Sequence, residues 1–143
     1  MICIPDVNVW VALTVANHDH HAIAREWMSD AIDRVGLGFC RVTQHGLLRT
    51  LTNKASMNGD PRRPEDAWEI YDHWRVVTGA SFQPEPPGLE ASWRLATKRY
   101  FARGSHWTDA YLWAFAAATG FSVATLDRSF YRPPGAAIEV ISG

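Results

Sequence analysis

Short apolar runs alternate with longer segments of helical periodicity along this chain. The runs are mostly continuous, as expected of strands buried in a parallel sheet, and they predict strands at residues 2–4, 37–42, 81–83, 121–126 and 137–141. Between them, apolar residues recur at intervals of three and four, which predicts helices at residues 7–16, 21–35, 43–53, 65–77, 89–101 and 107–119. This alternation predicts one α/β domain over residues 1–143, with a mainly parallel central sheet flanked by helices.

Residues near the element boundaries support this division. Asp6 follows the first strand and can cap the helix that begins at the next residue, because a carboxylate accepts backbone N–H groups there. Thr43 is expected to cap the third helix in the same way. Ile32 and Leu95 share helical spacing with apolar neighbours, so we expect both side chains to be buried. Residues 102–106 separate the last two predicted helices.

The composition is that of an ordinary folded domain. Hydrophobic residues make up 47% and charged residues 20% of the sequence, a balance typical of globular proteins. No apolar run approaches the roughly 18 residues needed to cross a bilayer, and the N-terminus lacks the pattern of a secretory signal. We therefore expect a cytoplasmic protein with no membrane association. Cys3 and Cys40 lie in apolar, strand-like runs, which favours two buried thiols over a disulfide.

Charge and tryptophan content bear on the partners of the protein. The net charge of −1 argues against a protein that binds nucleic acid mainly through a basic surface. It still allows a nuclease, because bound divalent cations can supply positive charge at a site. The chain has seven tryptophans, and we expect most of them in the core and some at an interface, where tryptophan is enriched.

Three aspartates are predicted to meet at one edge of the sheet. Asp6 and Asp127 each follow a predicted strand, and the C-terminal ends of parallel strands lie at the same edge, where α/β sheets bind ligands. Asp109 lies in the first turn of the helix that precedes the Asp127 strand, and this helix runs back across the sheet to begin near that edge. Three carboxylates repel one another unless a cation neutralises them, and Mg²⁺ or Mn²⁺ prefers such oxygen ligands. We therefore expect a metal site here.

Each of these aspartates also has a purely structural interpretation. Asp6 can serve only as a helix cap, and Asp109 only as a favourable charge in a first helical turn. Asp127 can simply begin a turn before Ser129. The convergence of all three on one sheet edge is what favours the functional interpretation.

Four segments together resemble a known family. Asp-Val-Asn-Val-Trp stands at residues 6–10, Thr-Gln-His-Gly-Leu-Leu-Arg at 43–49, Thr-Asp-Ala-Tyr-Leu at 108–112 and Ala-Thr-Leu-Asp-Arg-Ser-Phe at 124–130. In this order and spacing they resemble PIN domains and, more narrowly, the VapC toxins of bacterial type II toxin–antitoxin systems. Residues 20–24 and Trp27 also fit one VapC branch. The resemblance covers nearly the whole chain.

The resemblance implies an activity and a set of site residues. It implies a Mg²⁺-dependent endoribonuclease that acts on tRNA, rRNA or mRNA, forms a homodimer and is neutralised by a VapB-type antitoxin. Asp6 and Asp109 match the main metal-binding aspartates of the family, and Asp127 matches its additional acidic position. Asn8 and Thr125 match the polar residues that accompany the first and last of these acids. In our interpretation Asp127 holds a second ion or orients the attacking water.

One position departs from the pattern of the family. Many PIN domains carry a glutamate on the helix after the second strand, where this chain has Gly46. Glycine offers no ligand, so a site of four acids does not carry over. For the neighbouring His45 we expect an exposed or capping role rather than metal coordination.

Several basic residues are candidates for RNA contact. Arg128 and Arg132 follow Asp127 and can reach phosphates of the scissile strand, as can Arg49, although each can also be ordinary surface charge. Arg49 can instead pair with a helix terminus or with the antitoxin. Basic residues at 62–63 and at positions 98, 99 and 103 can extend an RNA track, but a solvated face is the default interpretation.

Two other interpretations remain open at this point. The histidines at positions 18, 20 and 21 share one turn and can in principle bind a transition metal, although no closed zinc pattern surrounds them. Alternatively, the absence of the usual glutamate suits a non-catalytic PIN-like module that binds RNA or a protein without cleaving it.

Overall fold

The computed structural model describes residues 1–99 and 106–143 and contains one five-stranded sheet. All neighbouring strands are parallel, in the order β3-β2-β1-β4-β5. The strands are β1 (Ile2–Pro5), β2 (Gly36–Phe39), β3 (Ser81–Phe82), β4 (Ser122–Thr125) and β5 (Ala137–Val140). The prediction of one α/β domain with a parallel sheet is confirmed for the fold.

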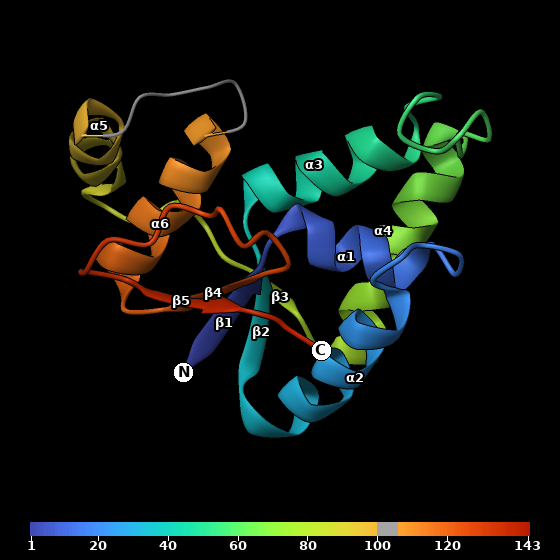
Figure 1. Ribbon diagram of the computed structural model, residues 1–143, viewed down its shortest axis with the longest axis horizontal. Helices are drawn as coiled ribbons and strands as arrows, with labels where there is room; N and C mark the ends of the chain where they lie inside the picture. The colour runs from blue at the N-terminus through green and yellow to red at the C-terminus, as the bar shows by residue number, and fades with distance from the viewer. Residues whose placement is uncertain (100–105) are drawn as a thin grey trace.

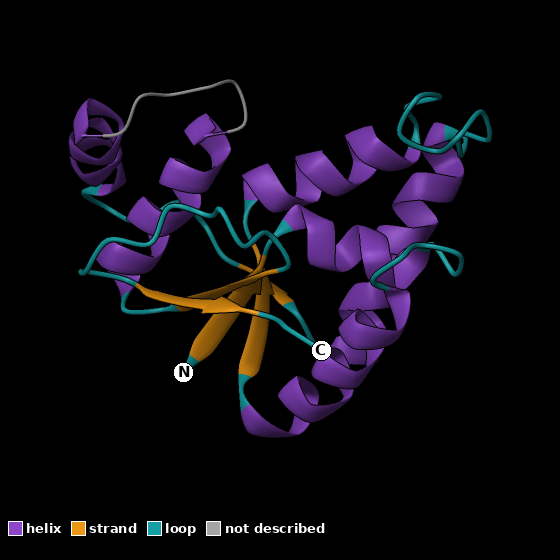
Figure 2. Ribbon diagram, viewed as in Figure 1, coloured by secondary structure: helices purple, strands orange, loops and turns teal. Residues whose placement is uncertain are grey.

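Helices cover both faces of this sheet (Figures 1 and 2). They are α1 (Val7–Thr14), α2 (His21–Arg34), α3 (Arg41–Leu51), α4 (Pro64–Thr78), α5 (Leu89–Arg99) and α6 (His106–Thr119). Figure 1 shows α5 and α6 on one side of the sheet and α1 to α4 on the other. The three-layer arrangement follows from strands that are apolar on both faces and therefore need cover on both.

Each face of the sheet has its own core. On the side of α1 to α4, Trp10 stacks on Phe39 with ring centroids 4.3 Å apart, and Leu47 and Leu51 of α3 pack into the same cluster. On the other side, Leu112 and three further buried residues of α6, Tyr111, Phe115 and Ala116, share a core cluster with residues of the strands. This rigid framework fixes the positions of the residues that leave the C-terminal ends of the strands.

The second strand and third helix differ from their predicted bounds. The strand ends at Phe39 rather than at residue 42, and α3 begins at Arg41 with Cys40 as its N-cap residue. Thr43 therefore does not cap the helix from outside. It lies in the first turn, where its hydroxyl accepts a hydrogen bond from the Cys40 N–H at 3.0 Å. Val42 extends the apolar run of the strand in the sequence, so the strand was predicted too long, whereas Val42 lies in the first turn of α3.

Two predicted core residues are exposed. Ile32 is 38% exposed and Leu95 is 48% exposed, because each lies at the margin of the apolar stripe of its helix. Cys3 and Cys40 are both buried and free, as predicted. Within the described residues, no helix is both long and apolar enough to cross a bilayer. The predicted end of the fifth helix at residue 101 and most of the break at 102–106 lie outside the described residues, and His106 already belongs to α6.

Candidate active site

The register of the sheet places Asp6 beside Thr125. Pro5 of β1 pairs with Ala124 of β4, and the next residue, Asp6, donates its backbone N–H to the Ala124 carbonyl at 2.8 Å. Asp6 is the N-cap of α1, and its Oδ1 accepts the Val7 N–H at 2.7 Å. The predicted capping role of Asp6 is therefore confirmed. This cap occupies only one carboxylate oxygen, so it does not exclude a second role.

A hydrogen-bond network holds the other oxygen of Asp6. The Thr125 hydroxyl, which is fully buried, donates to Asp6 Oδ2 at 2.9 Å. The Asn8 side-chain amide donates to the same oxygen at 3.3 Å and to Thr125 Oγ1 at 3.1 Å. Asn8 Oδ1 in turn accepts the Leu126 N–H at 3.0 Å. Asn8 and Thr125 thus lock the Asp6 carboxylate and join the ends of β1 and β4.

Asp109 approaches the same place from α6. It lies in the first turn of this helix and is only 7% exposed. Burial, together with the negative charges of Asp6 and Asp127, raises the pKa of Asp109 from 3.8 to about 7. Burial also raises the pKa of Asp6, and the Asp127 charge adds to this, against the lowering effect of the hydrogen bonds from Thr125 and Val7. The negative charge of Asp127 thus raises the pKa of both Asp6 and Asp109, and all three carboxylates line one cleft.

Asp127 is more exposed and bonds to its own turn. Its Oδ1 accepts the Ser129 N–H at 2.9 Å and the Ser129 hydroxyl at 2.7 Å. Its backbone N–H donates to Thr125 Oγ1 at 3.1 Å, which links it to the Asp6 network. The predicted turn-forming role of Asp127 is therefore present alongside its place in the acidic group.

The donor chemistry of this group fits a hard divalent cation. No lysine or arginine in the described part of the chain forms an ion pair with any of the three aspartates. Their mutual repulsion therefore has no counter-charge from those side chains, and Mg²⁺ or Mn²⁺ prefers carboxylate and water oxygens. Across residues 1–99 and 106–143, no three histidine, cysteine or acidic side chains are already gathered around one ion position.

The three aspartates open into a cleft of about 940 Å³. Its remaining walls come from α1, the turn before α2, α3, the segment after α3 and the start of α6. They include Asn8, Val11, His18, Val42, His45, Gly46, Arg49, Thr50, Asn53, Ser56 and Thr108. The cleft is therefore acidic at its base and polar along α3.

Gly46 is where α3 comes closest to α1. A Cβ atom at position 46 would overlap the side chain of Val7, the first residue of α1. A side chain such as glutamate would fit at this position only if Val7 or one of the two helices moved. The departure that the sequence shows at residue 46 is a property of how the two helices pack.

Comparison with known proteins agrees with this geometry. The sequence profile of the PIN domain matches residues 3–136 of the chain. Ribonuclease VapC41 of Mycobacterium tuberculosis, in strains CDC 1551 / Oshkosh and ATCC 25618 / H37Rv, is 37% identical over 145 residues, which cover 96% of this chain and 97% of the relative. The chain is a PIN domain of the VapC family. The family predicted from the four sequence segments is thereby confirmed.

A solved structure has the same fold as this PIN domain. In the crystal structure of VapBC2 from Rickettsia felis bound to a DNA fragment from their promoter, one chain superposes with a TM-score of 0.73. The match covers 99% of the present chain and 100% of that chain, at 12% sequence identity. At this identity the likeness supports the fold alone.

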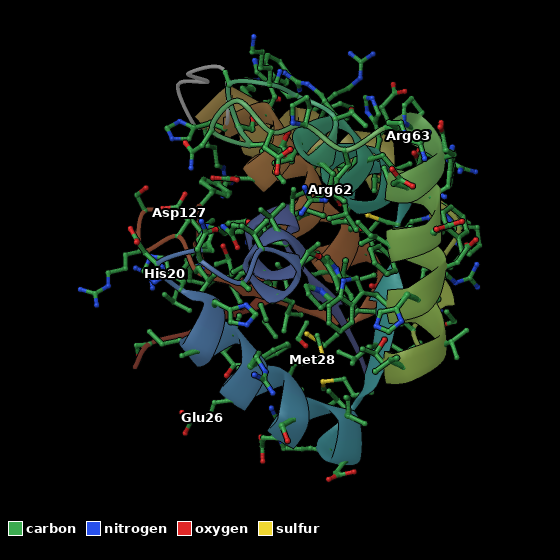
Figure 3. The ribbon with its side chains drawn as sticks, turned by 90° about the vertical axis from the view of Figure 1, so that its right-hand side faces the viewer. His20, Glu26, Met28, Arg62, Arg63 and Asp127 are labelled. Atoms are coloured by element: carbon green, nitrogen blue, oxygen red, sulfur yellow. The ribbon has the colours of Figure 1, made fainter. Side chains whose placement is uncertain are left out.

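Of the predicted RNA-contacting arginines, the PIN cleft includes Arg49. Its side chain is exposed and lies along the α3 wall. Arg128 and Arg132 do not line the cleft, and Arg132 donates to the Arg128 carbonyl at 3.2 Å within its own loop. Figure 3 shows Arg63 at the N-terminal end of α4, toward the opposite side of the view from Asp127. Arg63 pairs there with Glu65 and Asp66, as expected of a solvated face.

The histidine turn is organised by local hydrogen bonds. The His20 N–H donates to His18 Nδ1 at 3.0 Å, and His21 Nδ1 lies 2.7 Å from the Ala12 carbonyl. These bonds use Nδ1 of His18 and Nδ1 of His21 only, and within the described residues the turn does not gather three ligand side chains around one ion position. His18 nevertheless lines the cleft, and His45 is exposed on the wall of α3, as predicted for an exposed residue.

Sequence reasoning missed four polar residues of the cleft, one of which is Thr50 on α3. Asn53 and Ser56 follow α3, and their place in the wall depends on how that helix packs, which no local pattern reveals. Thr108 directly precedes Asp109, so its position beside a suspected ligand was a signal that could have identified it.

Proposed function

We propose that this PIN domain is the toxin of a type II toxin–antitoxin system and hydrolyses RNA phosphodiester bonds as a Mg²⁺-dependent endoribonuclease, with Mn²⁺ as an alternative ion. The meeting of Asp6, Asp109 and Asp127 in one open cleft carries the proposal. The 37% identity to ribonuclease VapC41 over nearly the whole chain supports it. The substrates expected from the family are tRNA, rRNA or mRNA, and we place the reaction in the cytoplasm.

Asp6 and Asp109 would hold the metal ion. A bound Mg²⁺ would lower the pKa of a water ligand and offset charge that develops on the phosphate oxygens. Thr125 and Asn8 both donate to Oδ2 and so fix the orientation of the Asp6 carboxylate for this role. Asp109 would lose its proton as the cation binds, because a nearby positive charge favours the ionised carboxylate.

Asp127 and Arg49 would complete the site. Asp127 would turn from Ser129 to hold a second ion or to orient the attacking water, as its lower burial permits. The exposed guanidinium of Arg49 would contact a phosphate of the bound strand and fix its position along α3. Arg128 and Arg132 would contact RNA only where the strand leaves the cleft.

The proposed partner is a VapB-type antitoxin, and the proposed assembly is a homodimer. The support for both is membership of the VapC family. Trp68 and Leu95 are among the large apolar side chains that are exposed in the single chain. Binding of a second copy or of an antitoxin would bury apolar side chains of this kind. A neighbouring gene that encodes a small DNA-binding protein would support the toxin assignment.

A cleavage assay tests the proposal against a non-catalytic binding module. Purified protein is incubated with a structured RNA in Mg²⁺ or in EDTA, and Asp6→Asn is compared with wild type. The control is Asp72→Asn, which changes an exposed aspartate on α4, away from the cleft. We expect cleavage by wild type and Asp72→Asn in Mg²⁺ only, and none by Asp6→Asn. Equal behaviour of wild type and Asp6→Asn would identify a binding module or a contaminating nuclease.

A further inference from the structure

A second hollow lies beside the active-site cleft, between α5 and the start of α6. It has a volume of about 630 Å³ and is lined by Glu90, Trp93, Arg94, Thr97, Lys98 and Trp107. Two tryptophans and two cations thus share one small groove. This combination matches the surfaces that bind single-stranded nucleic acid, which join aromatic rings to positive charges.

The indole of Trp93 forms the fixed floor of this groove. Its Nε1–H donates to the Trp107 carbonyl at 3.1 Å. Its ring meets the ring of Trp107 edge to face, with centroids 6.0 Å apart, and meets the ring of Tyr111 in the same way at 5.2 Å. Trp93 therefore holds the Trp107 segment in place while its own ring is packed.

Trp107, in contrast, presents its ring to solvent. It is 50% exposed although it belongs to the first turn of α6, a helix whose later residues are almost all buried. Because Trp93 packs against the Trp107 ring while half of the Trp107 side chain remains exposed, a flat ligand can stack on Trp107 without a rearrangement of the protein. The small entropic cost of such a pre-arranged surface favours binding.

The rim of the groove is positively charged. Arg94 and Lys98 stand one turn apart on α5, and Arg94 also pairs with the exposed Glu90. The groove thus carries a net positive charge in a protein whose overall charge is −1. The sign is the one that attracts a phosphate backbone.

The groove and the active-site cleft both have lining residues in the first turn of α6. Trp107 lines the groove, whereas the next two residues, Thr108 and Asp109, line the cleft. A strand with one phosphate at the aspartates has its neighbouring nucleotides within reach of this turn. The groove and the proposed reaction site therefore adjoin the same first turn of α6.

We propose that Trp107 stacks against an unpaired base of the RNA substrate, next to the phosphate that is cleaved, and that Lys98 contacts the adjoining backbone. This inference rests on the proposed ribonuclease function and names its substrate more narrowly, as a single-stranded segment such as a loop. An unpaired base is required because a base inside a helix has both faces covered by its neighbours.

RNA binding without cleavage tests this proposal. A fluorescently labelled, single-stranded oligoribonucleotide of mixed sequence is titrated in EDTA with wild type, Trp107→Ala, Trp107→Phe and Lys98→Gln, and the dissociation constant is read from anisotropy. The control is Trp68→Ala, which removes an equally exposed tryptophan (49%) from α4. Each variant is first checked for its melting temperature, and its mass in solution is measured.

Loss of one stacked base weakens binding by about 5- to 150-fold. We expect a loss in this range for Trp107→Ala, a much smaller loss for Trp107→Phe, and a weaker salt dependence for Lys98→Gln. Wild type should also prefer the single strand to a duplex of the same sequence, and Trp68→Ala should bind like wild type. Equal affinity of Trp107→Ala and wild type would overturn the proposal. So would a Trp107→Ala protein that changes only from dimer to monomer, because the groove would then be an interface between copies.

These outcomes are separable from failure of the proposed function. If Asp6→Asn cleaves RNA as wild type does, the nuclease assignment fails whatever Trp107 binds. If cleavage requires Asp6 but Trp107→Ala keeps full affinity for RNA, only the stacking role is wrong.

Discussion

At the scale of single residues, the site depends on how Asp6 is held. A carboxylate at a strand end has several rotamers, and Thr125 and Asn8 select one by donating to Oδ2. The same Thr125 hydroxyl accepts the Asp127 N–H, so one buried side chain positions two acids. Outer partners of this kind orient metal ligands and affect both metal affinity and activity.

Replacement of Thr125 by valine tests this positioning role. Thr125→Val keeps the shape of the side chain but removes the bonds to Asp6, Asn8 and Asp127. We expect a loss of about 10- to 100-fold in Mg²⁺-dependent cleavage, since that is the usual cost of removing an outer-shell partner. Thr125→Ser retains the hydroxyl and should recover most of the rate. A Thr125→Val protein with the wild-type rate would show that Asp6 needs no such support.

The raised pKa of Asp109 predicts how metal-free stability depends on pH. The folded protein holds this proton up to about pH 7, whereas the unfolded chain releases it near pH 3.8. Folding is therefore favoured by this group below about pH 4, and the contribution is lost as pH rises through 7. In EDTA at pH 8, Asp109→Asn should have a melting temperature at least a few degrees above that of wild type, since 1 kcal/mol corresponds to about 2–4 °C. The difference should shrink as the pH falls toward 4. A difference in melting temperature that does not change with pH would contradict the raised pKa of Asp109.

At the scale of elements, the close approach of α1 and α3 decides the shape of the cleft. Gly46 lets Val7 lie against the α3 backbone, which brings His45 and Arg49 to the wall beside the aspartates. The sequence could indicate that a ligand is missing at residue 46. It could not indicate why, because helix–helix contact between residues so far apart leaves no periodic signal.

Gly46→Ala should destabilise the protein although alanine is the better helix former. The gain in helix propensity is about 1 kcal/mol, whereas overpacking costs about 1–3 kcal/mol. In denaturant unfolding experiments, we expect Gly46→Ala to lower the free energy of unfolding when it is introduced into the wild-type sequence. In a Val7→Ala background, where space is available for the new methyl group, we expect it to leave the free energy of unfolding unchanged or to raise it. Equal effects in the two backgrounds would mean that Val7 is not what the new methyl group meets.

The elements themselves were largely predictable, and the exceptions have local causes. Apolar runs and helical spacing located the strands and helices, since both faces of a parallel sheet are buried. The boundary at Cys40 was wrong because Val42 continues an apolar run across a change of backbone conformation. The three aspartates were predictable because strand ends share an edge, whereas the Trp93–Trp107 groove depends on how α5 packs against α6.

At the scale of the whole molecule, the proposed catalytic residues lie at one edge of the sheet. The C-terminal ends of β1 and β4 and the start of α6 deliver the acids, α3 supplies a polar wall, and α5 adds a cationic groove. The protein thus needs no overall positive charge to bind RNA, because charge is supplied locally by a few arginines and lysines and by the proposed metal ion. The central claim is that the acids work together through that ion.

The rate of RNA cleavage as a function of Mg²⁺ concentration tests this claim most directly. We expect the wild-type rate to rise from zero in EDTA to a plateau as Mg²⁺ is added. The rate of Asp109→Asn should be at least about 100-fold lower at every Mg²⁺ concentration that supports wild-type cleavage, because loss of a metal ligand costs more than loss of a residue that only orients a ligand. The exposed-site control Asp72→Asn should follow the wild-type curve. Cleavage that persists in EDTA, or an Asp109→Asn curve that coincides with wild type, would contradict the account.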